Sequence, residues 1–405
     1  MTLPSMTPPS MTLRLFKYLG SEDEASPEFR YLQSVCVARA REVFGDVDLA
    51  VWRPGRAEPS THAVRSDDYV LVLGRENVWF TAETLRRMKA AIDRGAACVS
   101  PARITDHPLH ELDPLYTARD FEQIEQHLCG HGQVSRAAAA SHLPISLFSG
   151  TAFASIAARA LVSRLLTDPG AAAPLAIEPV GVFHQFADYY GETRADLIPY
   201  LPADAQEVLE VGCGRGFTGR LIQQQLGCRV TGVELHPEIA AEAARHLSRV
   251  ITGDILSVDV DGRYDAIVAS ELFEHLADPD AFLLKMMPLL KSGGVIVLSV
   301  PNVGHYSVVE DLLAGRWDYV PAGLLCCTHL RFFTRRTLTD LMARLQCDAT
   351  IVPQITELPE RFRQITASLP SDPDSLRTRG FYVVVRPASP ASPASGAPGD
   401  STPTS

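Results

Sequence analysis

The sequence lacks any run of about 18 apolar residues, the length that a membrane-spanning helix needs. Its start, MTLPSMTPPS, has neither the cationic residues nor the apolar core of a secretory signal. It also lacks a CxxC pair, and its eight cysteines do not follow the spacing of a disulfide framework. We therefore expect a cytoplasmic protein without a membrane partner and with reduced thiols. The adjacent Cys326 and Cys327 allow two interpretations, ordinary packing or a site for a soft metal or thiophilic substrate.

An excess of positive charge is also missing, because the formal net charge is −11. An acidic surface does not attract phosphate backbones, so nucleic acid is an unlikely partner. The chain has 405 residues, 46% of them hydrophobic, which is enough for two ordinary domains. The sequence leaves the oligomeric state open.

Two shifts in composition divide the chain. PASPASPASGAPGDSTPTS, from Pro387 onward, is too poor in apolar residues to fold, and TDPGAAAPLAIEP has the composition of a linker. We therefore predict a disordered start, a small α/β domain, a linker, a larger domain and a disordered tail, at residues 1–14, 15–165, 166–180, 181–386 and 387–405.

The first half alternates helix and strand patterns. PEFRYLQSVCVARAREVF predicts a helix, DLAVW and YVLVL predict strands, and AETLRRMKAAIDRG predicts a helix that Gly95 ends. The stretch from Asp67 to Arg103 resembles the middle of nucleotide-sugar glycosyltransferase domains. The position of their metal-binding Asp-x-Asp motif reads LGREN here. The resemblance implies a degenerate domain that serves as a scaffold or recruits substrate rather than one that catalyses.

In the second half, EVLEVG, RVTGVEL, YDAIVAS, GGVIVLSV, ATIVP and FYVVVRP predict strands between helical stretches. The first four are nearly continuous apolar runs, as is typical of parallel strands covered on both faces. We predict a doubly wound α/β sheet. Ligands of such sheets bind beyond the carboxyl ends of the strands.

The first of these strands runs into EVGCGRGFTG at residues 210–219, whose glycines allow the backbone to turn sharply and approach a ligand. A dinucleotide fingerprint would need glycine at position 217, where this chain has Phe217. With Glu210, the stretch resembles motif I of class I S-adenosylmethionine-dependent methyltransferases. That family has a Rossmann-like, seven-stranded, mostly parallel sheet.

The resemblance implies a set of cofactor-binding residues. Glu234 follows the next strand and would accept both ribose hydroxyls. Asp254 would face the adenine amino group with Ile255 beside the ring. FADYYGETRADLIPYLP resembles the helix that covers the cofactor, so Tyr189 and Tyr190 either close over the methionine end or pack in the core. The motif itself would contribute Glu210, Gly212, Gly214 and Gly216.

ASELFEHLADP, at residues 269–279, lies directly after the fourth strand, where the methyl acceptor is expected. If a helix begins here, Glu271, Glu274 and His275 project from one face of it. The segment resembles the E-x-x-E-H motif of ubiquinone-biosynthesis O-methyltransferases and of the catalytic domain of small-RNA 2′-O-methyltransferases. In both families these residues bind a divalent metal, and the resemblance of THLRFFTR implies His329 as the fourth ligand.

Two carboxylates and two imidazoles suit Mg²⁺, Mn²⁺ or Fe²⁺, and a coordinated hydroxyl would lose its proton more easily. We expect O-methylation of a diol, a catechol or a carbohydrate-like small molecule, with Glu274, His275 and His329 as catalytic residues. A metal-free N-, C- or S-methyltransferase with His275 or His329 as base is an alternative. RNA methylation and a non-catalytic cofactor-binding scaffold are further alternatives. Four side chains either line the acceptor pocket or pack a lid: His305, Tyr306, Trp317 and Tyr319.

Overall fold

The computed structural model describes nine stretches of the chain, which are residues 12–18, 27–52, 64–73, 77–103, 145–153, 179–186, 190–320, 323–363 and 374–387. They form two compact units. The first unit comprises Met1–Tyr189 and Glu310–Thr328, and the second comprises Tyr190–Val309 and His329–Ser405. Residues 166–178 of the predicted linker at 166–180 and the tail beyond Pro387 lie outside the described residues, and the last two linker residues begin a strand. No helix among the described residues is long and apolar enough to cross a membrane.

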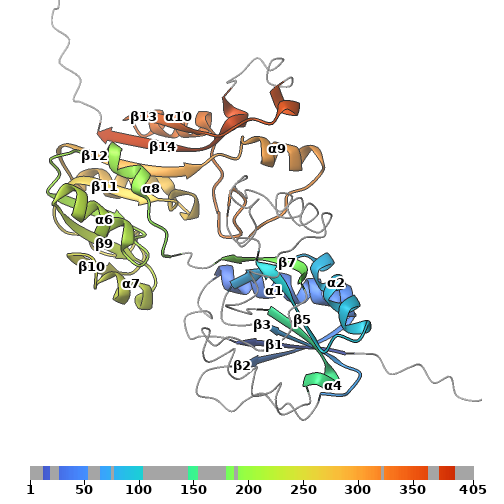
Figure 1. Ribbon diagram of the computed structural model, residues 1–405. Coiled ribbons are helices and arrows are strands. Elements are labelled where there is room, and N and C mark those ends of the chain that lie inside the picture. Colours follow the sequence, from blue (N-terminus) through green and yellow to red (C-terminus); the bar gives the residue numbers. More distant parts are fainter. Residues whose placement is uncertain are drawn as a thin grey trace, which may run out of the picture. The chain divides into compact units, whose positions relative to one another are not determined.

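The first unit contains a seven-stranded mixed sheet with helices packed against it (Figure 1). Its order is β2-β1-β3-β6-β5-β7-β4, in which β6 runs antiparallel to both of its neighbours. The elements are β1 (Thr12–Tyr18), α1 (Pro27–Phe44), β2 (Asp46–Trp52), β3 (Tyr69–Leu73), β4 (Asn77–Trp79), α2 (Ala82–Asp93), β5 (Cys98–Arg103), β6 (Ile145–Ser149), α4 (Gly150–Phe153) and β7 (Pro179–Phe186).

Helix α2 shows how this unit follows from its sequence. The Thr81 side chain accepts a hydrogen bond from the N–H of Thr84 and caps the helix start. Leu85, Met88 and Ile92 form the buried stripe that the spacing predicted, and they pack in one core with β3 and β6. Helix α2 ends before Gly95, which has a φ of +103°.

The domain boundaries differ from the prediction at two places. Strand β1 begins at Thr12, inside the stretch that the composition assigned to a disordered start. Strand β7 pairs with β4 and β5, so residues 181–186 belong to the sheet of the first unit, and the units divide between Tyr189 and Tyr190. The boundary between the units depends on which strands pair, and composition alone does not reveal the pairing of strands that are distant in the sequence.

The second unit has a sheet of order β10-β9-β8-β11-β12-β14-β13. The first five strands are parallel to their neighbours, and β14 runs antiparallel to both β12 and β13, so the predicted seven-stranded, mostly parallel sheet is confirmed. The strands are β8 (Glu207–Val211), β9 (Arg229–Glu234), β10 (Arg249–Thr252), β11 (Tyr264–Ser270), β12 (Leu290–Pro301), β13 (Cys347–Ile355) and β14 (Thr378–Pro387).

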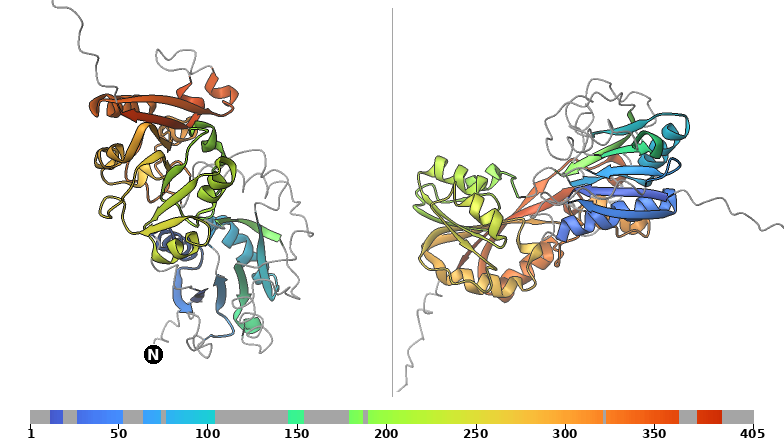
Figure 2. Two further views of the ribbon diagram at one scale, coloured as in Figure 1. Left: turned by 90° about the vertical axis from the view of Figure 1, so that its left-hand side faces the viewer. Right: turned by 90° about the horizontal axis from the view of Figure 1, so that it is seen from below.

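The helices of this unit are α6 (Phe217–Leu226), α7 (Pro237–Ala243), α8 (Pro279–Met286), α9 (Tyr306–Leu313) and α10 (Arg335–Arg344). Helix α9 ends in the segment that groups with the first unit. The short 3₁₀ helices are η5 (Ala195–Tyr200), η6 (Phe273–His275), η7 (Met287–Leu289) and η8 (Ser375–Arg377). Figure 2 gives two further views of the sheet and its helices.

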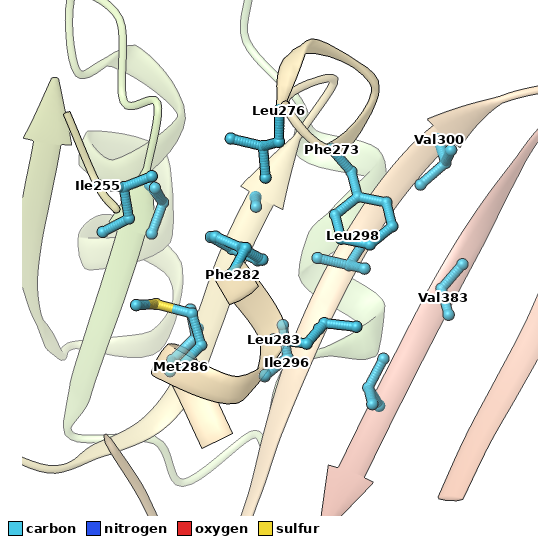
Figure 3. Packing of buried hydrophobic residues seen from close by; sticks show 14 of the residues in the cluster. Ile255, Phe273, Leu276, Phe282, Leu283, Met286, Ile296, Leu298, Val300 and Val383 are labelled. Atoms are coloured by element: carbon cyan, nitrogen blue, oxygen red, sulfur yellow. The ribbon is translucent and has the colours of Figure 1, made fainter. Parts of the chain in front are cut away.

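Alternate residues of the central strands fill two separate cores. On one face, Leu209, Ile267 and Leu298 pack with α8 and α10, and Figure 3 shows part of this core. On the other face, Val208 and Val268 pack with η5, α6 and α7. Burial on both faces explains why these strands read as continuous apolar runs, and it leaves the carboxyl ends of the strands for ligands.

Candidate active site

A glycine loop follows β8 at the centre of the sheet. Gly212, Gly214 and Gly216 have φ values of +69°, +52° and +81°, a region that other residues rarely adopt. A Cβ atom on Gly214 would lie 2.5 Å from the backbone oxygen of Tyr190, which also accepts a hydrogen bond from the N–H of Arg215 (2.9 Å). The loop therefore holds a close backbone turn that only glycine permits.

Glu234, at the end of β9, faces this loop. Its Oε2 accepts a hydrogen bond from the N–H of Gly214 (2.9 Å), and its Oε1 accepts one from the N–H of His236 (3.0 Å). The side chain is buried. Each carboxylate oxygen keeps further acceptor capacity, which suits a pair of ribose hydroxyls. The rings of Tyr190 and His236 meet edge to face with centroids 5.5 Å apart, beside this carboxylate.

Glu210 is the acidic residue of the motif and is almost completely buried. A Cβ atom on Gly219 would lie 2.3 Å from its Oε2, so glycine at position 219 makes room for the carboxyl group. Burial raises the pKa of Glu210 to about 8, although the N–H of Gly219 acts in the opposite direction. A buried carboxyl group with this pKa is mostly protonated, and therefore neutral, at pH 7.

The remaining predicted cofactor residues differ in placement. Asp254 is exposed and caps a turn, because its carboxylate accepts hydrogen bonds from the N–H of Leu256 and the hydroxyl of Ser257 (both 3.0 Å). Ile255 is buried in the core. Tyr189 lies outside the described residues, and the helix expected to cover the cofactor is limited to the 3₁₀ helix η5.

Beyond β11, the structure brings together Glu274, His275 and His329. One potential ligand atom from each of them lies within 4.8 Å of the other two. Glu274 is completely buried, His329 is buried and His275 is half-buried. The His329 Nε2 lies 3.8 Å from the Glu274 Oε1, and the two imidazole rings meet edge to face with centroids 4.8 Å apart. We call these three residues the triad.

Backbone and core contacts hold the two segments of the triad in place. The backbone oxygen of Glu274 accepts hydrogen bonds from the N–H groups of Leu330 (2.8 Å) and Arg331 (3.0 Å). Phe273 is buried in the core and stacks on Phe333 with ring centroids 5.3 Å apart. These contacts join the segment of η6 to the segment that carries His329.

Glu271, the remaining one of the four expected ligands, is not part of the triad. The continuous helix considered from the sequence does not form. The 3₁₀ helix η6 begins only at Phe273, and Glu271 has a φ of +45°, so the i, i+3, i+4 geometry does not apply. Its Oε1 accepts hydrogen bonds from Arg194 Nη1 (3.0 Å) and Ser299 Oγ (2.6 Å) instead. Of the four predicted metal ligands, the structure therefore brings three together.

Arg194 is a residue that sequence reasoning missed. Its guanidinium group donates hydrogen bonds to both oxygens of Asp196 and to Glu271, Ser270 and Ser299, at distances of 2.8–3.3 Å. Burial would lower the pKa of Arg194, but the two acidic neighbours raise it, so the group carries a full charge. No motif marks this arginine, because apart from the nearby Asp196 its partners come from two distant segments of the chain.

The triad suits a divalent cation. Ligand atoms that share one octahedral ion lie about 3 Å apart when adjacent and about 4.2 Å apart when opposite. The spread of up to 4.8 Å therefore needs only small side-chain rotations to close on an ion. One carboxylate and two imidazoles are a mixed O/N donor set that leaves coordination positions for other ligands. Burying a charged carboxylate is energetically costly, and a bound cation would compensate the charge of Glu274.

The residues considered for an acceptor pocket differ in how far they are buried. His305 is completely buried between the hydroxyls of Ser307 (2.9 Å) and Thr356 (3.1 Å), and burial lowers its pKa to about 3, so it packs as a neutral side chain. Tyr306 is half-buried, and its ring contacts that of His305. Trp317 and Tyr319 are exposed. Cys326 is buried and Cys327 is half-buried, both as thiols.

Comparison with known proteins identifies the kind of domain that carries these residues. A protein-family model described as a methyltransferase domain matches residues 182–350. The ubiquinone biosynthesis O-methyltransferase of Xanthomonas axonopodis pv. citri (strain 306) is 36% identical over 109 residues, which are 25% of this chain and 45% of that protein. The enzyme of the same description from Cereibacter sphaeroides (strain ATCC 17029) is 29% identical over 169 residues, 39% of this chain and 66% of that protein.

Among solved structures, a SAM-dependent methyltransferase from Archaeoglobus fulgidus has a TM-score of 0.36 at 21% identity, covering 47% of this chain and 90% of that one. The magnesium protoporphyrin IX methyltransferase from Synechocystis, with bound SAH, has a TM-score of 0.34 at 14% identity, covering 47% and 80%.

The family match identifies residues 182–350 as a methyltransferase domain, and together with the sequence relatives it supports a class I S-adenosylmethionine-dependent enzyme. The expected resemblance to the ubiquinone-biosynthesis O-methyltransferases is confirmed. The chain spans between about half and two thirds of the length of the curated relatives that it matches.

Proposed function

We propose that the second unit transfers the methyl group of S-adenosylmethionine to a hydroxyl oxygen of a small molecule with vicinal hydroxyls, such as a catechol or a sugar. A divalent cation held by Glu274, His275 and His329 would assist the transfer. The observation that carries this proposal is the position of the triad beside the glycine loop. The side chain of Leu272, two residues before Glu274, lies 3.2 Å from the position that a Cβ atom on Gly212 would occupy.

The roles of the residues follow from their geometry. The glycine loop and Glu234 would hold the donor, with the Glu234 carboxylate accepting hydrogen bonds from its ribose hydroxyls. In the transfer, the bond from sulfur to the methyl carbon breaks while the bond to the acceptor oxygen forms, and S-adenosylhomocysteine and the hydroxyl proton are released. A cation on the triad would supply Lewis acidity that makes this proton easier to remove. Glu274 is completely buried, whereas half-buried His275 is the member of the triad that remains partly accessible.

A metal-free transferase is a second candidate, because half-buried His275 can take a proton directly from an acceptor. In that version His275 or His329 is the base, and the acceptor atom can be nitrogen, carbon or sulfur. A scaffold that binds the cofactor without turnover is the remaining alternative. For the first unit, we propose a scaffold or substrate-recruiting role in a degenerate glycosyltransferase-like domain.

The test uses the full chain with S-adenosylmethionine and a panel of catechols and vicinal-diol sugars. The proposal predicts S-adenosylhomocysteine formation that EDTA abolishes, that added Mg²⁺ or Mn²⁺ restores, and that Glu274→Gln lowers at least a hundredfold. Turnover that survives EDTA would favour the metal-free enzyme. Cofactor binding without turnover on any acceptor would favour the scaffold. Glu207→Gln, which changes a carboxylate paired with Arg229 outside the triad, is the matched control.

A further inference from the structure

Glu271 is held by three contacts in a backbone conformation that is unfavourable for glutamate. Its φ of +45° is one of two positive values among the non-glycine residues that the structure describes. The backbone N–H of Glu271 donates to Ser299 Oγ (3.0 Å), and Ser299 Oγ in turn donates to Glu271 Oε1 (2.6 Å). Ser299 is completely buried at the end of β12 and therefore provides a fixed anchor.

Arg194 provides the third contact, and it is itself immobilised. Its backbone N–H donates to Thr218 Oγ1 (3.0 Å), and its guanidinium group forms a two-pronged ion pair with Asp196. Asp196 also accepts a hydrogen bond from the hydroxyl of Tyr382 in β14 (2.6 Å). Burial would raise the pKa of Asp196, but the hydrogen bonds from Arg194 and Tyr382 outweigh it and lower the pKa to about 2. Arg194 therefore stays charged and fixed in place.

These contacts compete with the triad for the same carboxylate. Glu271 is only three residues from Glu274, and its side chain is 43% exposed, so it has room to rotate. Rotation into the triad would break the ion pair with Arg194 and the bond from Ser299. The triad would then gain a second carboxylate, and additional ligand charge is a main determinant of divalent-cation affinity.

We propose that Arg194 is a positioning residue that holds Glu271 away from the triad and thereby limits the cation site to one carboxylate and two imidazoles. This inference rests on the proposed function, because it concerns the same cation site. A site with three protein ligands keeps more coordination positions for both hydroxyls of a vicinal diol than a site with four. Arg194 thus tunes cation affinity and leaves room for the acceptor.

The experiment measures Mn²⁺ binding to the full chain by electron paramagnetic resonance of the unbound ion. Removal of the Glu271 carboxylate in Glu271→Gln should leave the affinity within about twofold of the wild type. Glu274→Gln should weaken it at least tenfold. Arg194→Gln releases Glu271 and should tighten binding roughly tenfold through the added carboxylate.

Two further variants separate release of Glu271 from a simple loss of positive charge. The double variant Arg194→Gln/Glu271→Gln should return to wild-type affinity, because no carboxylate remains to be released. Ser299→Ala loosens Glu271 without changing any charge, and it should tighten binding by a smaller factor. Arg344→Gln is the matched control, since it removes an arginine from an exposed ion pair with Asp280 and should change nothing.

Three results would overturn the inference: a tenfold loss of Mn²⁺ affinity in Glu271→Gln, tightening that persists in the double variant, or no change in both Arg194→Gln and Ser299→Ala. If Arg194→Gln fails to fold, Ser299→Ala and Glu271→Gln decide the question. A wild-type protein that binds no Mn²⁺ would remove both the inference and the cation-assisted version of the function. Titration with S-adenosylmethionine tells these cases apart, because donor binding is expected in every variant.

Discussion

His329 Nε2 lies 3.8 Å from Oε1 of the completely buried Glu274, although β12 and α9 separate the two residues along the chain. A carboxylate buried this deeply needs a compensating charge. The neighbouring imidazoles supply that charge only when they are protonated, whereas a divalent cation supplies it at any pH that leaves the imidazoles neutral. The fold thus places Glu274 and His329 where both could bind the proposed cation.

Replacement of His329 tests this relationship. His329→Gln removes one of the two imidazoles, so Mn²⁺ affinity should fall at least tenfold while the affinity for S-adenosylmethionine stays within about twofold. Equilibrium dialysis and calorimetry measure the two affinities. His246→Gln is the control, because its ring contacts Phe217 outside the triad. Equal Mn²⁺ affinity in the two variants would argue against a cation on the triad.

A pair of glycine variants tests the donor site. Gly214 and Gly227 both have positive φ, so alanine at either position costs about 1–2 kcal/mol of stability. Open space surrounds the Cβ position at Gly227, but at Gly214 that position overlaps the backbone oxygen of Tyr190. Gly214→Ala should therefore weaken S-adenosylmethionine binding at least tenfold in a calorimetric titration. Gly227→Ala should lower the melting temperature and leave that affinity unchanged, and similar affinities in both variants would contradict the assignment of the loop.

Glu210 makes stability depend on pH. Its pKa of about 8 in the folded protein lies above the value of about 4.3 expected for an unfolded chain, so the folded state binds the proton more tightly. The contribution of Glu210 to stability is at its full value below about pH 4.3. It declines as the pH rises and is lost near pH 8.

Glu210→Gln is neutral at every pH and should abolish this decline. Urea unfolding between pH 5 and pH 8.5 should show the stability of the variant rising relative to the wild type as pH increases. Glu207→Gln should not show this trend. Parallel curves for Glu210→Gln and the wild type would mean that the buried carboxyl group does not titrate in this range.

Local sequence patterns predicted much of the second unit, because strands buried on both faces must be apolar throughout and because glycine is strongly favoured at the positive φ values of Gly212, Gly214 and Gly216. The same patterns located Glu234 after β9, whereas only the resemblance of THLRFFTR to a family motif indicated His329 as a partner of Glu274. They could not place Glu271, because its conformation depends on Arg194 and Ser299, which reach it from other segments of the chain. The pairing of β7 with the first sheet was missed for the same reason.

The most direct test of the account is calorimetric titration of S-adenosylmethionine into the wild type and Glu234→Gln. Glutamine keeps the size of the side chain but replaces one carboxylate oxygen by an NH₂ group. That group cannot accept hydrogen bonds, so it loses both the backbone N–H and the ribose hydroxyl that the oxygen would accept. The account predicts saturable one-to-one binding to the wild type and at least tenfold weaker binding to the variant, or about 1.4 kcal/mol. No binding to the wild type, or equal affinity in the two proteins, would contradict it.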